Sequence, residues 1–267
     1  MKGNAAVRND FFKENEMQDA LADMFWTYLL QAFLIFGSAA FILAFPLPFF
    51  ARRFDKFLPA DPGTALVRSF HIPRFAKSAN ENRRKQRRQY WKKLISAGIK
   101  WGLLGVVTIC CIIFFNLPLA LFLFLWLCAL LACIDEKIHV LPDVLTIPLI
   151  LSGFLFAALS WLEISPLASA CGAAGGFLLP TLTSALMTPI RPRSMGGGDF
   201  KMLAGIGAWL GFTGLAVTIL LSFFFFAAIA LVKRKKEGPY GASLLLAVIA
   251  TLILQTLPAF RFLFVIV

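Results

Sequence analysis

Long uncharged, apolar stretches separated by short polar clusters dominate this chain. No charged side chain occurs within residues 102–134, 144–162, 164–190 or 202–232. Runs of about 18 or more such residues are long enough to form helices that cross a bilayer. The pattern therefore predicts an all-α, polytopic membrane helix bundle. It excludes a soluble enzyme, a disordered chain and a secreted disulfide scaffold.

Two of the uncharged stretches are too long for a single crossing. As one helix, residues 102–134 would extend roughly 50 Å, whereas the hydrocarbon core is about 30 Å thick. Asn116-Leu117-Pro118 supplies a turn in this stretch, and Gly211-Phe212-Thr213-Gly214 divides residues 202–232 in the same way. We expect about eight transmembrane segments, with 202–210 as a short or re-entrant arm: 25–46, 95–115, 118–134, 144–162, 166–187, the two arms of 202–232, and 239–258.

The distribution of charge predicts the orientation. The 267 residues carry 26 Lys and Arg against 14 Asp and Glu, which gives a net charge of +12. Segment 51–94 holds 13 basic and three acidic residues, or 13 − 3 = +10. By the positive-inside rule it is a basic cytoplasmic loop that can contact anionic lipid, and no nucleic-acid partner is expected. The expected organisation is an extracytoplasmic segment 1–24, a first transmembrane segment 25–50, this loop, and a membrane domain 95–267.

Cysteine placement gives no sign of a metal centre. All five cysteines lie within apolar runs, they form no CxxC pair, and no histidine is close at ligand spacing. We therefore expect no bound metal and interpret these cysteines as small buried apolar side chains.

Two aspartates are the chief candidates for chemistry. Acidic side chains are costly at membrane depth and are usually functional there. Counting sides along the chain places Asp135 and Asp199 at the cytoplasmic ends of their spans. Two carboxylates within hydrogen-bond reach cannot both ionise easily and share a proton. The ionised partner can then accept a proton from water while the protonated partner polarises a carbonyl, although the topology only permits the two to meet.

Glycines surround the second aspartate. Gly196-Gly197-Gly198 precede Asp199, and three glycines allow another backbone, such as that of an extended substrate, to approach closely. Gly205 and Gly207 are expected to permit close helix packing, and Trp209 to anchor an interface. By themselves the three glycines are equally consistent with a flexible loop between helices.

The run from Gly196 to Gly211, GGGDFKMLAGIGAWLG, resembles type IV prepilin peptidases, which are GxGD-type intramembrane aspartyl proteases. A second match is Ile134-Asp135 followed by LPDVLTIP at 141–148. Weaker similarity occurs at Gly37-Ser38 and at Gly238-Pro239-Tyr240-Gly241. The resemblance covers about residues 117–250 and makes the membrane domain 95–267 a peptidase domain.

The resemblance implies that Asp135 and Asp199 form the catalytic dyad. Asp143 is the competing first aspartate, and Asp135 is favoured because the family's first aspartate precedes the Leu-Pro-Asp tripeptide. The remaining site residues are expected to support the dyad or to bind substrate: Asp143, Gly196, Gly197, Gly198 and Lys201.

The resemblance also implies the substrate and the location. Prepilin peptidases remove the short basic leader from type IV prepilins or from pseudopilins of type II secretion, at the cytoplasmic face of the bacterial inner membrane. Many also N-methylate the new terminus, using a large loop that often carries paired CxxC zinc motifs. Segment 51–94 contains no cysteine, which argues against methyltransferase activity. No cofactor is expected, and S-adenosylmethionine only if that activity is retained.

Two alternatives belong to other functional classes. A membrane transporter also has polar interruptions and glycine-rich breaks in its helices. A non-catalytic assembly subunit of a pilus or secretion system would keep the fold without the chemistry.

Overall fold

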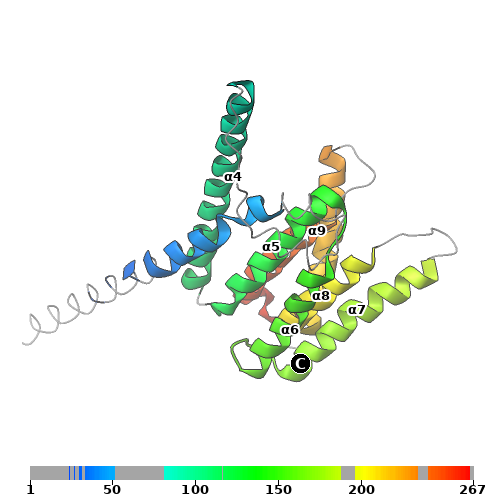
Figure 1. The fold of residues 1–267 in the computed structure, drawn as a ribbon. Helices are drawn as coiled ribbons and strands as arrows, with labels where there is room; N and C mark the ends of the chain where they lie inside the picture. Colours follow the sequence, from blue (N-terminus) through cyan, green and yellow to red (C-terminus); the bar gives the residue numbers. More distant parts are fainter. Residues whose placement is uncertain are drawn as a thin grey trace, which may run out of the picture.

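A computed structural model describes residues 24, 27, 30, 31, 34–51, 81–115, 117–187, 196–233 and 240–264, the side chains of 81–87, 233 and 261–263 excepted. Every regular element in this part is helical, and Figure 1 shows their arrangement. An apolar helical segment, Leu34–Ala51, comes first. The elements that follow are α4 (Glu81–Phe114), α5 (Ala120–Ile138), α6 (Asp143–Ala158), α7 (Pro166–Met187), α8 (Gly197–Lys233), α9 (Gly241–Thr256) and the short 3-10 helix η1 (Pro258–Leu263).

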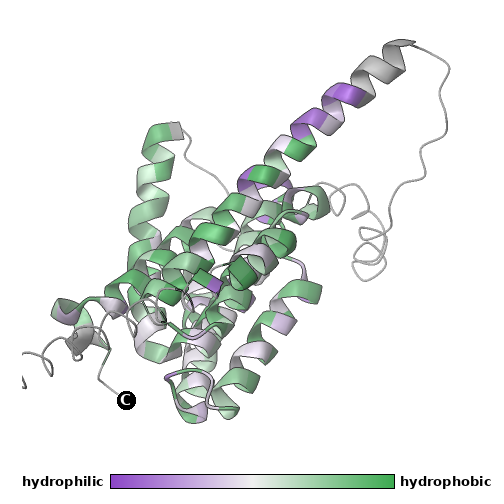
Figure 2. Cartoon of the chain, turned by 90° about the vertical axis from the view of Figure 1, so that its left-hand side faces the viewer, coloured by the Kyte–Doolittle hydropathy of each residue, from purple (hydrophilic) through white to green (hydrophobic). Residues whose placement is uncertain are grey.

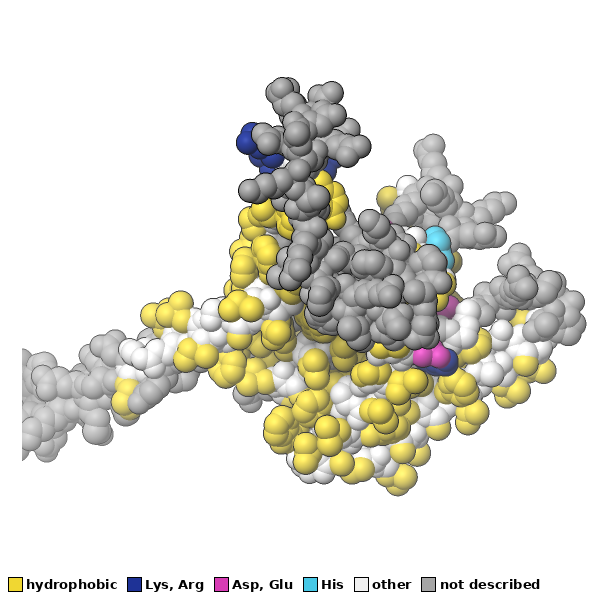
Figure 3. Space-filling view, in the orientation of Figure 1, with side chains coloured by type: hydrophobic (Ala, Val, Ile, Leu, Met, Phe, Trp, Pro, Cys, Tyr) yellow, Lys and Arg dark blue, Asp and Glu magenta, His cyan; other side chains and the backbone are white. Residues whose placement is uncertain are grey.

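The predicted all-α membrane bundle is confirmed. Four described helices are long and apolar enough to cross a membrane: Leu34–Ala51, Arg88–Phe114, Pro166–Met187 and Gly197–Val232. α6 and α9 are shorter apolar helices. Hydrophobic side chains cover much of the face seen in Figure 3, and hydrophobic residues dominate the bundle in Figure 2. Apart from residue 24, the N-terminal segment 1–24 lies outside the described residues, as do residues 52–80 of the basic loop.

The helix that contains the second predicted span begins before that span. α4 starts at Glu81 rather than near residue 95 and runs for 34 residues. A helix of that length extends about 51 Å and exceeds the roughly 30 Å hydrocarbon core. The first turns of α4 that Figure 2 colours are largely hydrophilic and project from the bundle. The sequence prediction followed the loss of charge, but backbone hydrogen bonds continue a helix through charged residues wherever water solvates their side chains.

The other spans lie close to their predictions. α7 occupies the predicted 166–187, and α5 continues past the predicted end at 134 so that it includes Asp135. α5 ends where His139 adopts a left-handed conformation and its N–H donates to the carbonyl oxygen of Asp135. The first predicted site residue therefore lies in the last turn of a helix.

α8 consists of two arms that meet at Gly211, as the sequence predicts. Gly211 has φ 70° and ψ −179°, a conformation that favours glycine. Beyond it, Gly214 lies beside Gln255, while Thr218 and Thr251 share a hydrogen bond of 3.0 Å. Residue numbers on α9 fall from 255 to 251 as those on α8 rise from 214 to 218, so the second arm runs antiparallel to α9. The first arm, 197–210, is only about 21 Å long and is too short to cross the hydrocarbon core alone.

Glycines allow the short arm to pack tightly against α7. A Cβ atom at Gly172 would collide with the carbonyl oxygen of Gly207, and one at Gly176 would lie on the backbone of Leu203. The buried Ser169 hydroxyl donates to the carbonyl oxygen of Ala208 at 2.6 Å along the same contact. The prediction that Gly207 permits close packing is therefore confirmed.

Trp209 differs from its prediction because it lies in the core rather than at an interface. Its side chain is 2% exposed, and its indole N–H donates to the carbonyl oxygen of Leu149 at 2.9 Å. Its ring packs against those of Phe124 and Phe156, with centroids 5.1 and 5.2 Å away. Because the carbonyl oxygen of Leu149 satisfies the indole N–H inside the bundle, the indole does not need water.

We predict that Gly172→Ala lowers the thermal stability of the protein in detergent. The added methyl group would meet the Gly207 backbone, and overpacking of this kind costs about 1–3 kcal/mol. Gly37→Ala is the matched control, since its Cβ would meet only Val106, at 3.7 Å. Equal unfolding midpoints for the two variants would contradict the close helix contact.

Candidate active site

Asp135 lies in a buried position at the end of α5. Its side chain is 5% exposed, and its Oδ2 accepts a hydrogen bond of 2.7 Å from the backbone N–H of Gly241. Gly241 is the first residue of α9, and the first N–H groups of a helix have no partner within the helix. The carboxylate and the free amide thus satisfy each other across two helices.

Asp199 lies in the first turn of α8, where it caps its own helix. Its backbone N–H donates to the carbonyl oxygen of Gly196 at 3.1 Å, and its Oδ2 accepts the N–H of Gly196 at 3.2 Å. An acidic residue three positions after the cap, bonded back to the cap N–H, is half of a capping box. The side chain therefore has a fixed direction although it lies beside glycines.

The structure brings Asp135 and Asp199 together. The two carboxylates lie near enough for their charges to interact, although 64 positions separate them in the sequence (199 − 135). The charge of Asp199 also acts on Tyr240, the residue that precedes α9. Paired carboxylates held by backbone amides are suited to proton transfer to and from a bound water.

Asp143 is placed differently from these two aspartates. It begins α6, and its Oδ1 accepts a hydrogen bond of 2.6 Å from the Lys201 ammonium group. Both side chains are substantially exposed, 56% for Asp143 and 35% for Lys201. Because Lys201 follows Asp199 by two residues, the ion pair ties the start of α6 to the arm that carries Asp199. Geometry therefore gives Asp143 a supporting position.

The three glycines before Asp199 have separate surroundings. Gly196 caps α8, and a Cβ at Gly197 would meet nothing within 4 Å. At Gly198 a Cβ would lie 2.7 Å from the Cβ of Leu141, so this glycine lets the arm approach the turn before α6. Only Gly198 is thus required by close contact in the free protein, whereas Gly197 leaves open space beside Asp199.

One contribution to the site was not predicted from the sequence. The resemblance gives Tyr240-Gly241 only weak similarity and no role, yet Gly241 supplies the hydrogen bond to Asp135. The available signal was a Gly-Pro-Tyr-Gly run directly before an apolar helix, because a helix start has free N–H donors. What could not be inferred was which carboxylate those donors would meet.

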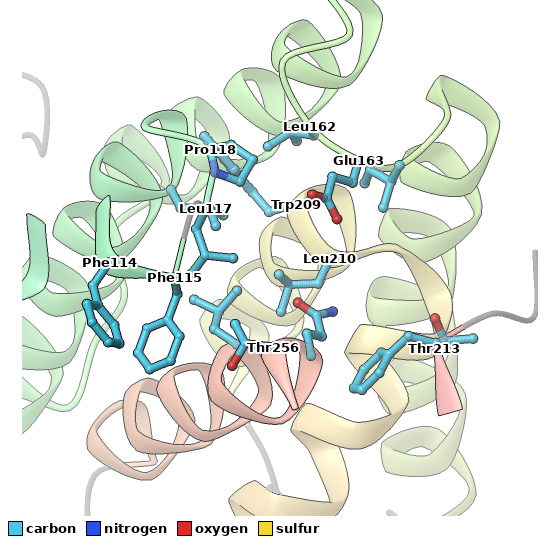
Figure 4. A pocket seen from close by; sticks show the side chains of 15 residues that line it. Phe114, Phe115, Leu117, Pro118, Leu162, Glu163, Trp209, Leu210, Thr213 and Thr256 are labelled. Carbon is cyan, nitrogen blue, oxygen red and sulfur yellow. The ribbon is translucent and has the colours of Figure 1, made fainter. Parts of the chain in front are cut away.

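A cavity of about 620 Å³ lies at the other end of the bundle (Figure 4). Its lining includes Leu117 and Pro118 before α5, Trp209 and Thr213 at the α8 break, and Thr256 at the end of α9. Since Asp135 and Asp199 occupy the opposite ends of these segments, this cavity is separate from the candidate active site. Among the described residues, no group of three His, Cys, Asp or Glu side chains could hold a metal ion.

Comparison with known proteins finds a family for the part of the chain that carries both aspartates. Residues 121–231, which include both aspartates, match the model of the type IV leader peptidase family. The resemblance to prepilin peptidases is confirmed. No solved structure matches the chain significantly.

Several curated relatives are named prepilin leader peptidase/N-methyltransferase. The Aeromonas salmonicida protein is 42% identical over 106 residues, which is 39% of this chain and 36% of the relative. The Klebsiella pneumoniae protein is 42% identical over 95 residues, 35% of this chain and 41% of the relative. The Escherichia coli protein is 35% identical over 104 residues, which is 39% of this chain and 46% of the relative. The matched part thus spans less than half the length of each of these leader peptidases.

We predict a small coupling between Asp143 and Lys201 in a double-mutant cycle of Asp143→Asn and Lys201→Met. Exposed ion pairs contribute about 0.2–1 kcal/mol because water screens them. Chemical unfolding of the four proteins in detergent measures the coupling energy. A coupling of about 3 kcal/mol or more, as found for buried pairs, would contradict the exposed geometry.

Proposed function

We propose that this chain is an intramembrane aspartyl endopeptidase that removes the basic leader from type IV prepilins or pseudopilins. The supporting observation is the juxtaposition of Asp135 and Asp199 within the segment similar to leader peptidases. Each carboxylate has one oxygen bonded to a backbone N–H at a helix start. The second oxygen of each carboxylate is then available for water or for the shared proton.

In the proposed mechanism the ionised aspartate takes a proton from a water molecule held between the two carboxyl groups. The water oxygen attacks the carbonyl carbon of the scissile peptide while the protonated aspartate donates its proton to the carbonyl oxygen. Collapse of this tetrahedral intermediate breaks the C–N bond: the amine nitrogen takes the proton that the first aspartate removed from water, and a hydroxyl of the intermediate gives its proton back to the second aspartate. The two carboxyl groups thus exchange acid and base roles within one turnover.

The basic residues support a proposal for the side of the membrane on which the site lies. Arg88, Lys92 and Lys93 lie along the start of α4, and this helix start and the end of α5 that carries Asp135 both lie at the upper end of Figure 1. Because positive charge favours the cytoplasm, we propose that the dyad lies at the cytoplasmic face of a bacterial inner membrane. The exposed Lys92 and Lys93 would also contact anionic headgroups there, in line with the proposed lipid contact of segment 51–94.

The proposed activity does not include N-methylation. Segment 51–94 lacks the cysteine pairs that the resemblance associates with the methylating loop, and most of this segment lies outside the described residues. The curated relatives carry N-methyltransferase in their names, but the matched part of this chain covers only a minor share of them. No bound S-adenosylmethionine is therefore proposed.

We predict that co-expression with a tagged prepilin from the same genome produces a shorter pilin on a gel. Asp135→Asn and Asp199→Asn each lower the rate of cleavage by about 10²–10⁴-fold, because each removes one partner of the proton transfer. Asp143→Asn is the matched control and retains cleavage, since Asp143 is paired with Lys201 at the surface.

Other outcomes of this experiment have defined meanings. Loss of cleavage in Asp143→Asn but not in Asp135→Asn would move the first catalytic role to Asp143. Failure of the wild-type protein to cleave any such precursor would contradict the peptidase and favour an assembly subunit. Substrate-dependent flux without cleavage would instead favour a transporter. Membrane levels of every variant need to match the wild type.

We also predict that the mature pilin keeps an unmethylated N-terminus. The expected result is a terminal peptide whose mass lacks one methyl group, measured by mass spectrometry after co-expression. Pilin processed by the Aeromonas salmonicida relative is the comparison sample. A methylated terminus produced by this chain alone would show that the proposal is wrong on this point.

A further inference from the structure

The turn that begins α9 connects three parts of the active site. Gly241 donates its N–H to Asp135 on α5, 106 positions away. Tyr240 shares a hydrogen bond between its hydroxyl and that of Ser222 on the second arm of α8. It also lies within reach of the charge on Asp199. Two adjacent residues thus contact both the helix that carries Asp135 and the helix that carries Asp199.

The contact at Gly241 has no room for a side chain. A Cβ atom there would lie 3.0 Å from Oδ2 and 3.1 Å from Cβ of Asp135, and 3.2 Å from Cα of Ala132. The Cα of Ala132 and the Cβ of Asp135 belong to a packed helix and cannot move aside readily, so a side chain here would push against the carboxylate oxygen itself. Only glycine lets the α9 backbone come close enough for its N–H to reach the carboxylate at 2.7 Å.

The tyrosine fixes the height of this turn along α8. Its ring packs against those of Phe223 and Phe226, with centroids 6.4 and 5.8 Å away. Its backbone carbonyl accepts the Ser243 hydroxyl at 2.6 Å and the Leu244 N–H at 3.0 Å, which completes the first turn of α9. Movement of Tyr240 would therefore carry Gly241 and its N–H with it.

We propose that Tyr240-Gly241 is a positioning element, in which the Gly241 amide fixes the Asp135 carboxylate opposite Asp199 and Tyr240 holds that amide in place through Ser222. This inference rests on the proposed peptidase function. The Gly241 bond occupies Oδ2 of Asp135, so Oδ1 is the oxygen that carries the proton or contacts water. Neither residue reacts with substrate, and both act through Asp135.

Gly241→Ala tests the first half of the proposal. Displacement of the carboxylate by a fraction of an ångström is expected to lower kcat for prepilin cleavage by about 10²-fold, with KM unchanged. The matched control is Gly105→Ala, whose Cβ would be more crowded, 2.7 Å from the Ala44 Cβ, but far from the dyad in sequence and in its contacts. This control is expected to lose thermal stability and to keep its kcat. Equal losses of kcat in both variants would overturn the positioning role.

Tyr240→Phe and Ser222→Ala test the second half. Each removes one end of the same hydrogen bond and is expected to lower kcat by about fivefold. The double variant should be no slower than either single variant, because the second change removes nothing further. Independent, multiplying effects would overturn the coupling. These conservative changes also keep the proposal testable if Gly241→Ala fails to accumulate in the membrane.

Asp135→Asn and Asp199→Asn, assayed in parallel, separate the two levels of inference. If both variants still cleave prepilin, the proposed aspartyl peptidase itself is wrong. If both are inactive while Gly241→Ala keeps the wild-type kcat, the dyad stands and the positioning role of α9 is overturned.

Discussion

The hydrogen bond between the Gly241 amide and the Asp135 carboxylate is the contact on which the candidate site depends. A carboxylate 5% exposed inside an apolar bundle needs a donor, and a helix start is where the backbone has donors to spare. Asp199 meets the same need locally, at the start of its own helix. Two helix starts thus converge on one acidic pair, and that convergence requires α5, α8 and α9 to end or begin at the same height.

Close backbone packing sets that height. The short arm of α8 packs on α7 through Gly172 and Gly207, and it reverses at Gly211 before a second arm returns beside α9. In a bilayer, helix association gains little from the hydrophobic effect, so small residues and buried hydrogen bonds carry much of the contact. The glycines after Asp199 therefore help to position the site, because they allow the arm that carries Asp199 to pack closely on α7.

Much of the fold could be predicted because it follows from local patterns of hydrophobic and charged residues. Uncharged runs located the membrane segments, and the limit on helix length required turns near Pro118 and Gly211. The loss of charge could not show where α4 starts, because a helix can continue through charged residues whose side chains water solvates. Trp209 was misplaced because its partner, the Leu149 carbonyl, comes from another helix. Local patterns could not reveal this contact between two helices.

By itself the sequence determined the membrane bundle, its approximate spans and the candidate residues Asp135, Asp143 and Asp199. It did so because hydrophobic length and charge act on each segment separately. Only the tertiary structure decided which aspartates lie together, placed Asp143 against Lys201, and brought Gly241 to Asp135. The physical reason is that a carboxylate's surroundings come from whichever helices pack beside it, and that choice depends on contacts between segments distant in the chain.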